Sequence, residues 1–145
     1  MTMKQVMLQA RASGDFQKAI DSVPYAKMIG MSCFALGDEL IFKLTASERN
    51  IGNPLLPAIH GGVLGGFMEA AAGFHIAFQS NIDQLPKIVD FSLDYLRSAK
   101  VVDTFARCDV IRQGKRVVNV QVTAWQSSPE QPITTARAHF LLPSA

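Results

Sequence analysis

Charge is almost absent from the middle of this 145-residue chain. Between Arg49 and Asp83, Glu69 is the only residue that carries a full charge at neutral pH. A segment so poor in charge is typical of a buried element. A carboxylate inside such an element is costly to desolvate unless it is paired with another group or used by the protein. Glu69 is therefore the first candidate functional residue.

Other features are also scarce, and each absence argues against a class of protein. The formal net charge is only +2, which gives no electrostatic argument for binding nucleic acid. The first 20 residues carry scattered charges and no apolar core segment, unlike a secretion signal or a membrane anchor. Cys33 and Cys108 lie far apart without metal-site spacing, which favours buried thiols and no metal. We expect a cytoplasmic protein with no membrane or nucleic-acid partner.

The stretch from Gly61 to Gln79 is apolar all round, which predicts a buried helix. Glycine inside a helix costs roughly 0.5–1 kcal/mol relative to alanine, so repeated glycines suggest that the space is needed. One interpretation is a slot that admits a ligand or another backbone beside the acid. The alternative is close packing on a sheet, with the acid bonded to backbone. On a helical wheel, the residues that share the face of Glu69 are small: Gly62, Gly65, Gly66, Ala72 and Gly73.

The rest of the chain predicts an α+β domain, one antiparallel sheet packed against the long helix. Short helices are expected within residues 4–20 and at 24–28. A strand pair or one long bent strand is expected within 31–46. Residues 50–57, with two prolines and a glycine, predict a loop without regular structure. Four strands are expected over 87–97, 101–112, 116–126 and 133–142. Their short connections predict an antiparallel meander.

Four features, in this order along the chain, resemble a known family. They are the loop residue Asn53, the motif His60-Gly61-Gly62, the acid nine residues after His60, and the strand VDFSLDYLRSAK at 89–100. The basic hairpin RQGKRVVNVQV at 112–122 fits the strands that follow. Over roughly residues 30 to 142 the chain resembles hotdog-fold acyl-CoA thioesterases of the phenylacetate-pathway (PaaI-like) type.

The resemblance implies a hotdog fold, in which an antiparallel sheet wraps around one long central helix. Residues 1–145 would form a single thioesterase domain, with 1–28 as an N-terminal helical extension. The implied reaction is hydrolysis of an acyl-CoA thioester, with Glu69 as general base or nucleophile and the Gly61 N–H as oxyanion donor. His60 and Asn53 are further catalytic candidates.

The resemblance also implies the partners. No cofactor is expected, because coenzyme A is part of the substrate. A homodimer or a tetramer (a dimer of dimers) is expected, with active sites between subunits. The coenzyme A phosphates require basic residues, and Lys115 and Arg116 beside Gly114 are the best-placed pair. Gly62 and Arg97 complete the predicted substrate-binding set, although a basic run can also be a solvated strand face.

Several alternatives remain open at this stage. His60 can hold the loop by hydrogen bonding instead of taking part in the chemistry. A non-catalytic acyl-CoA sensor and a hotdog dehydratase or hydratase are competing functions on the same fold. The acid at position 69 argues against the sensor, and the His60-Gly61-Gly62 motif argues against the dehydratase. The sequence does not distinguish an aryl from a medium-chain acyl group, or coenzyme A from a carrier protein.

Overall fold

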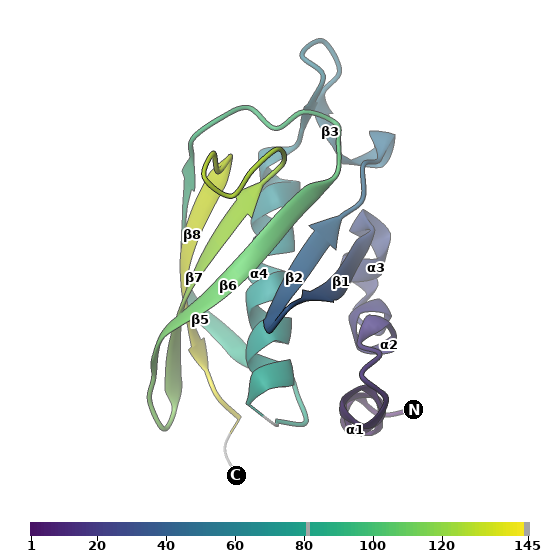
Figure 1. Cartoon of the computed structure of the whole chain (residues 1–145), viewed down its shortest axis with the longest axis vertical. Helices are drawn as coiled ribbons and strands as arrows, with labels where there is room; N and C mark the ends of the chain where they lie inside the picture. The colour runs from purple at the N-terminus through teal and green to yellow at the C-terminus, as the bar shows by residue number, and fades with distance from the viewer. Residues whose placement is uncertain (81, 144–145) are drawn as a thin grey trace.

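A curved six-stranded antiparallel sheet surrounds one long helix, α4 (Gly61–Gln79), in the computed structural model (Figure 1). The structure describes residues 1–80 and 82–143. The strand order is β1-β2-β6-β7-β8-β5, and β3 and β4 form a separate small sheet. This is the predicted α+β arrangement. The remaining elements are α1 (Met3–Ser13), α2 (Gln17–Asp21), α3 (Pro24–Ile29), β1 (Met31–Leu36), β2 (Glu39–Leu44), a 3-10 turn (Glu48–Asn50), β3 (Ile51–Asn53), β4 (Ala58–Ile59), β5 (Lys87–Tyr95), β6 (Thr104–Gln113), β7 (Val117–Trp125) and β8 (Thr134–Leu141).

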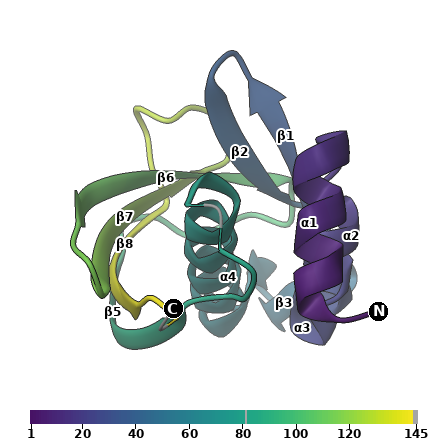
Figure 2. The same ribbon diagram turned by 90° about the horizontal axis from the view of Figure 1, so that it is seen from below.

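The core lies between α4 and the concave face of the sheet. Phe67 and Phe74 of α4 are fully or almost fully buried, as are the alternate residues Val118, Val120 and Val122 of β7. A helix that is apolar all round needs cover on most of its circumference. The curved sheet supplies that cover on one side and the N-terminal helices supply it on the other (Figure 2). The prediction of a buried helix over Gly61–Gln79 is confirmed.

The order of the strands corrects the predicted meander. β6, β7 and β8 are consecutive neighbours, but β5 pairs with β8 and not with β6. The connection after β5 is longer than predicted, because β5 ends at Tyr95 and β6 begins only at Thr104. It passes over the ends of β7 and β8 (Figure 1), and its Ala99 carbonyl accepts a hydrogen bond from the Ile59 amide. Alternating hydrophobicity indicates which face of a strand is buried but not which strand lies beside it.

Residues 50–57 are also more regular than predicted. Ile51 pairs with Ile59 and Asn53 with Ala58, so the segment forms a short hairpin. Both prolines lie in the connection between the strands, where no ladder hydrogen bond is required of them. The hairpin projects from the end of the molecule at which α4 begins (Figure 1).

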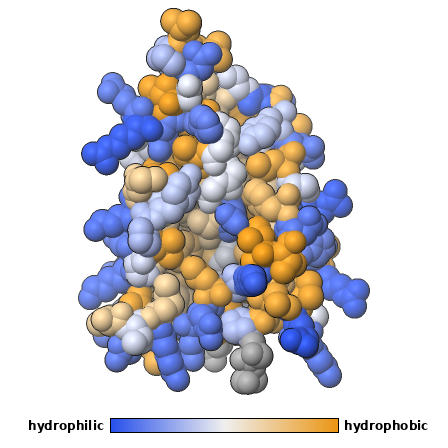
Figure 3. Space-filling model, turned by 180° about the vertical axis from the view of Figure 1, so that it is seen from behind, coloured by the Kyte–Doolittle hydropathy of each residue, from blue (hydrophilic) through white to orange (hydrophobic). Residues whose placement is uncertain are grey.

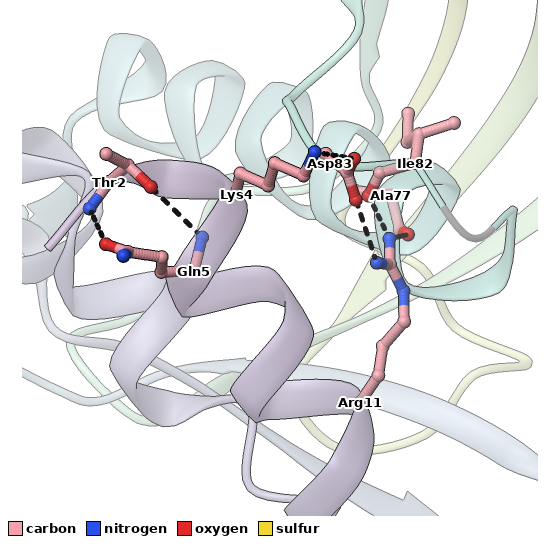
Figure 4. Close-up of polar contacts among 7 residues, drawn as sticks. All are labelled: Thr2, Lys4, Gln5, Arg11, Ala77, Ile82 and Asp83. Carbon is pink, nitrogen blue, oxygen red and sulfur yellow. Dashed lines mark hydrogen bonds and ion pairs between the residues drawn. The ribbon is translucent and has the colours of Figure 1, made fainter.

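The N-terminal helices belong to the same packed core as the rest of the chain. Val6 and Met7 of α1 are buried against it. The Arg11 guanidinium donates to the Ala77 carbonyl at 2.8 Å, near the end of α4 (Figure 4). Asp83 lies 3.7 Å from Arg11 and 3.9 Å from Lys4. These contacts hold α1 against the C-terminal end of α4.

Both cysteines are free thiols. Cys108 is buried as predicted, and Cys33 is half-buried. Burial, with a smaller contribution from Asp15, raises the pKa of the Cys33 thiol to about 11. Burial also raises the pKa of Cys108 far above its ordinary range. Neither thiol is therefore a reactive thiolate at neutral pH.

Candidate active site

The first turn of α4 is capped by a histidine. His60 is the N-cap residue, and its Nδ1 accepts a hydrogen bond from the Gly62 amide at 2.9 Å. A Cβ at position 62 would lie 2.8 Å from the His60 ring, so glycine is needed there for the cap to form. Because Nδ1 accepts a hydrogen bond, the neutral ring carries its proton on Nε2. His60 thus has the structural role foreseen as one of its two interpretations.

Asn50, which the sequence analysis did not single out, holds the segment before the cap. It is 4% exposed, and its Nδ2 donates to the Ile29 carbonyl at 3.0 Å. Its own carbonyl accepts a hydrogen bond from the His60 amide at 2.7 Å. The end of α3 is therefore joined to the start of α4 through one buried residue, by its side chain on one side and its backbone carbonyl on the other.

Tyr95 contacts the same turn from β5. Its hydroxyl donates to the Gly61 carbonyl at 2.7 Å. Its ring carbon Cζ lies 3.3 Å from the position that a Cβ at Gly61 would occupy. Tyr95 and the His60 cap thus hold the Gly61–Gly62 peptide from two sides.

The Gly61 N–H is the free amide of this helix start. The amides of Val63 and Leu64 donate to the His60 carbonyl, and the Gly62 amide donates to the His60 ring. Within residues 1–80 and 82–143, no acceptor is bonded to the Gly61 N–H. A free N–H at a helix N-terminus favours negative charge and can stabilise a developing oxyanion.

Glu69 lies two turns further along α4 and is half-buried. In the described part of the chain its carboxylate takes part in no hydrogen bond or ion pair. The alternative in which Glu69 bonds to backbone therefore has no support. A carboxylate that is partly removed from water and free of protein partners can act as a base or as a nucleophile.

The small residues around Glu69 do not form one open face, and part of this face is packed closely on the sheet, as the second interpretation expected. Gly65 is buried against Leu93 of β5, whose Cδ1 lies 3.0 Å from the position of a Cβ there. Gly73 is buried with Phe140 of β8 nearby. Ala72 is also fully buried. A helical wheel does not reveal how far the sheet curves around the helix. Only Gly62 and Gly66 remain accessible on this face.

A groove of about 350 Å³ lies beside the free amide. Its lining includes Gly61, Tyr95 and Arg97, the last from the loop after β5. Arg97 also donates to the Pro132 carbonyl, which steadies its guanidinium. The structure thus brings together two of the predicted site residues, Gly61 and Arg97.

Gly61 and Glu69 are separated along their own helix. Eight residues at 1.5 Å per residue place their Cα atoms about 12 Å apart along the axis. An oxyanion donor and a base must both lie about 3 Å from the reacting group. A glutamate side chain that leans back along the helix is too short to close this gap. One chain therefore does not bring its own Gly61 and Glu69 onto one thioester.

The basic hairpin lies far from the helix start. Gly114, Lys115 and Arg116 line a groove of about 440 Å³ at the tip of the β6–β7 hairpin. This tip adjoins the C-terminal end of α4, where Gln113 contacts Ser80 (Figure 1). The helix spans about 28 Å, so this groove and the Gly61 groove lie at opposite ends of the molecule. Within one chain the predicted coenzyme A set is divided, with Gly62 and Arg97 at the other end.

Asn53 is occupied in the loop of the β3–β4 hairpin. Its Oδ1 accepts a hydrogen bond from the Leu55 amide at 2.9 Å. Leu55 and Leu56 at the tip are 92% and 68% exposed. The top of the molecule in Figure 3, the end from which this hairpin projects, is apolar. A catalytic role for Asn53 stays a prediction.

The described residues offer no group of three side chains that could hold a metal ion. None of the helices in this part of the chain has the length and apolar character needed to cross a membrane.

A known family and solved structures are similar to this chain. The family model described as thioesterase superfamily matches residues 56–133. A protein of Chromobacterium violaceum is 40% identical over 96% of this chain and 97% of its own, with a TM-score of 0.81. No curated protein matches the chain.

Two more distant structures share the fold alone. A phenylacetic acid degradation-related protein of Ralstonia eutropha is 20% identical, with a TM-score of 0.71 over 83% of this chain and 90% of its own. A thioesterase of Haemophilus influenzae is 16% identical, with a TM-score of 0.68 over 79% of each chain.

Proposed function

The chain belongs to the thioesterase superfamily, and from this premise we propose that it hydrolyses an acyl-coenzyme A thioester to the free acid and coenzyme A. The family supports thioester hydrolysis as the class of reaction. The observation that carries the proposal is the free Gly61 amide at the start of a buried helix with one unpaired carboxylate, Glu69.

In the proposed reaction the thioester oxygen accepts a hydrogen bond from the Gly61 N–H. Glu69 takes a proton from water as the water oxygen attacks the carbonyl carbon, and the oxyanion of the tetrahedral intermediate forms at the helix N-terminus. Collapse of the intermediate breaks the carbon–sulfur bond, and the coenzyme A thiolate receives the proton from Glu69. In the alternative route, Glu69 attacks the carbonyl carbon directly, and water then hydrolyses the resulting anhydride.

Two copies of the chain are needed for this site. The distance between Gly61 and Glu69 of one helix supports a site built from Gly61 of one copy and Glu69 of the other. β5 lies at a sheet edge, and an exposed edge favours pairing with another strand. Antiparallel pairing of two β5 strands about a two-fold axis would also run the two α4 helices antiparallel. For Gly61 of each helix to lie opposite Glu69 of the other, the two-fold axis would pass near Gly65, which is midway between them in the sequence. We therefore propose a homodimer as the working unit, alone or within a tetramer.

The same pairing supports a role for the basic hairpin. An antiparallel partner would carry its Lys115 and Arg116 towards the helix start of the first copy. We propose that these two residues, beside Gly114, bind the phosphates of coenzyme A, with Arg97 closer to the thioester. Arginine and lysine are the residues that bind phosphate groups most effectively.

Reversing both charges, by Lys115→Glu with Arg116→Glu, should raise KM for acyl-CoA several-fold with kcat little changed. The dependence of KM on salt should also weaken, because fewer charge–charge contacts with the phosphates remain for salt to screen. Steady-state kinetics at two ionic strengths measures both effects. The matched control is Lys18→Glu with Lys27→Glu, an equal change of charge on exposed residues of the N-terminal helices. If the hairpin variant behaves like the wild type with both coenzyme A and pantetheine thioesters, the hairpin is only a solvated face.

The proposed function is tested with a panel of acyl-CoAs and a thiol reagent that detects released coenzyme A. The raised pKa values of Cys33 and Cys108 keep the background from the native protein small. We expect release of coenzyme A that depends on enzyme concentration. Binding of acyl-CoA without release would instead favour a sensor. A carrier-protein thioester in the same panel distinguishes the two thiol carriers.

A further inference from the structure

Tyr25 of α3 lies directly on the helix that carries Glu69. Its ring carbon Cε1 lies 2.6 Å, and its hydroxyl oxygen 2.8 Å, from the position that a Cβ at Gly66 would occupy. A side chain at position 66 would displace this ring from its present position. The glycine is therefore explained by one contact, with a residue 41 positions earlier in the chain.

The short helix that carries this ring is held in place at both ends. Pro24 occupies the first turn of α3, where its fixed φ suits a helix start. At the other end of α3, Asn50 bonds both the Ile29 carbonyl and the His60 amide. α3 is thus joined to the start of α4, which fixes the backbone that carries Tyr25 relative to α4.

Tyr25 and β5 border the accessible face of α4 from opposite sides. Gly65 and Gly66 are neighbours on α4, with Leu93 of β5 on the first and Tyr25 on the second. A helical side chain covers the turn before its own Cα, so the Glu69 side chain leans over these two glycines. The Glu69 side chain and the Tyr25 ring are therefore directed over the same glycine, Gly66. Tyr25 is still 40% exposed, and within the described ranges its hydroxyl makes no hydrogen bond.

We infer that Tyr25 is a specificity-determining residue, the wall that limits the size of the acyl group beside Glu69. The inference rests on the proposed function and deepens it. With the ring in place, short or planar acyl groups would be accepted beside Glu69, and long chains that would pass over Gly66 would be excluded. The N-terminal extension is then part of the substrate site and not only a cover for the core.

The test measures kcat/KM for a panel of straight-chain acyl-CoAs of increasing length, with one aryl-CoA. Tyr25→Ala should raise kcat/KM for the longest substrate relative to the shortest by on the order of tenfold. One methylene group more or less in a hydrophobic site typically changes kcat/KM by about 10–200-fold. Tyr25→Phe keeps the ring and should keep the wild-type profile. Met28→Ala is the matched control, since Met28 lies on α3 but is 60% exposed.

The outcomes separate this inference from the proposed function. If the wild type hydrolyses acyl-CoA and Tyr25→Ala leaves the ratio of longest to shortest substrate within twofold, Tyr25 does not set specificity. If the wild type hydrolyses no member of the panel, the proposed function fails and this inference fails with it. Should Tyr25→Ala not fold, Tyr25→Leu retains apolar volume and must still shift the profile towards longer chains.

Discussion

Glu69→Gln should lower kcat by about 10²–10⁴-fold with KM nearly unchanged. Glutamine keeps the size and the hydrogen-bonding reach of the side chain but removes the base and the nucleophile. The carboxylate forms no hydrogen bond or ion pair in the described part of the chain, so its loss should cost little stability. Kinetics with an acyl-CoA, together with thermal unfolding of the same preparation, measures both effects.

The matched control is Glu39→Gln, which neutralises an exposed acid at the start of β2. It should leave kcat and the melting temperature unchanged. A structural role for Glu69 would give the opposite pattern, a large fall in melting temperature and near-normal turnover in the folded fraction. Hydrolysis by Glu69→Gln within a few-fold of the wild type would show that the assignment of Glu69 is wrong.

Gly61→Pro should lower kcat by about 10²–10³-fold, the usual cost of losing one oxyanion-hole donor. Proline removes the N–H and is well tolerated at the first position of a helix. His60 has φ −59° and ψ 130°, a conformation that suits the residue before a proline. The helix should therefore form, and its circular dichroism and melting temperature can be compared with the wild type.

Gly61→Ala separates the amide from the effect of the added side chain. Alanine places a Cβ 3.3 Å from the Tyr95 ring, as proline does, but keeps the N–H. We expect Gly61→Ala to retain most of the activity that Gly61→Pro loses. Equal losses in the two variants would assign the effect to crowding of Tyr95 and would remove Gly61 from the reaction.

The central helix and its acid could be predicted because their signals are local. A stretch of more than 30 residues with almost no charged side chain indicates burial. One carboxylate inside that stretch can be recognised without any knowledge of the fold. The bounds Gly61–Gln79 follow from the same composition. The hairpin at β1 and β2 also has a local cause, since Gly37 in the turn has a φ of 62° that favours glycine.

The residues that position the site could not be predicted in the same way. Tyr95 bonds the Gly61 carbonyl across 34 positions of sequence, and Asn50 bonds the Ile29 carbonyl across 21. Neither contact is reflected in the hydrophobic periodicity of the sequence. The pairing of β5 with β8 could not be predicted either, because it depends on the path of the β5–β6 connection and not on the sequence of β5 itself.

The division of the predicted site has a physical cause as well. The family resemblance implied that Gly61 and Glu69 act on one thioester, but a straight helix holds them about 12 Å apart along its axis. Lys115 and Arg116, between β6 and β7, lie at the far end of the molecule from Gly61. A second copy of the chain, arranged about a two-fold axis as proposed above, would reunite these groups.

Mixing two inactive variants tests most directly whether Gly61 of one copy and Glu69 of another form one active site. Gly61→Pro and Glu69→Gln are denatured and refolded together in equal amounts, and release of coenzyme A is compared with that of each variant refolded alone. If each site takes Gly61 from one copy and Glu69 from the other, every mixed dimer contains one site with both groups intact. Half of the dimers would be mixed, so the sample should recover about a quarter of wild-type activity. Activity no higher than the mean of the two separate variants, in a sample shown to contain mixed dimers, would contradict the account.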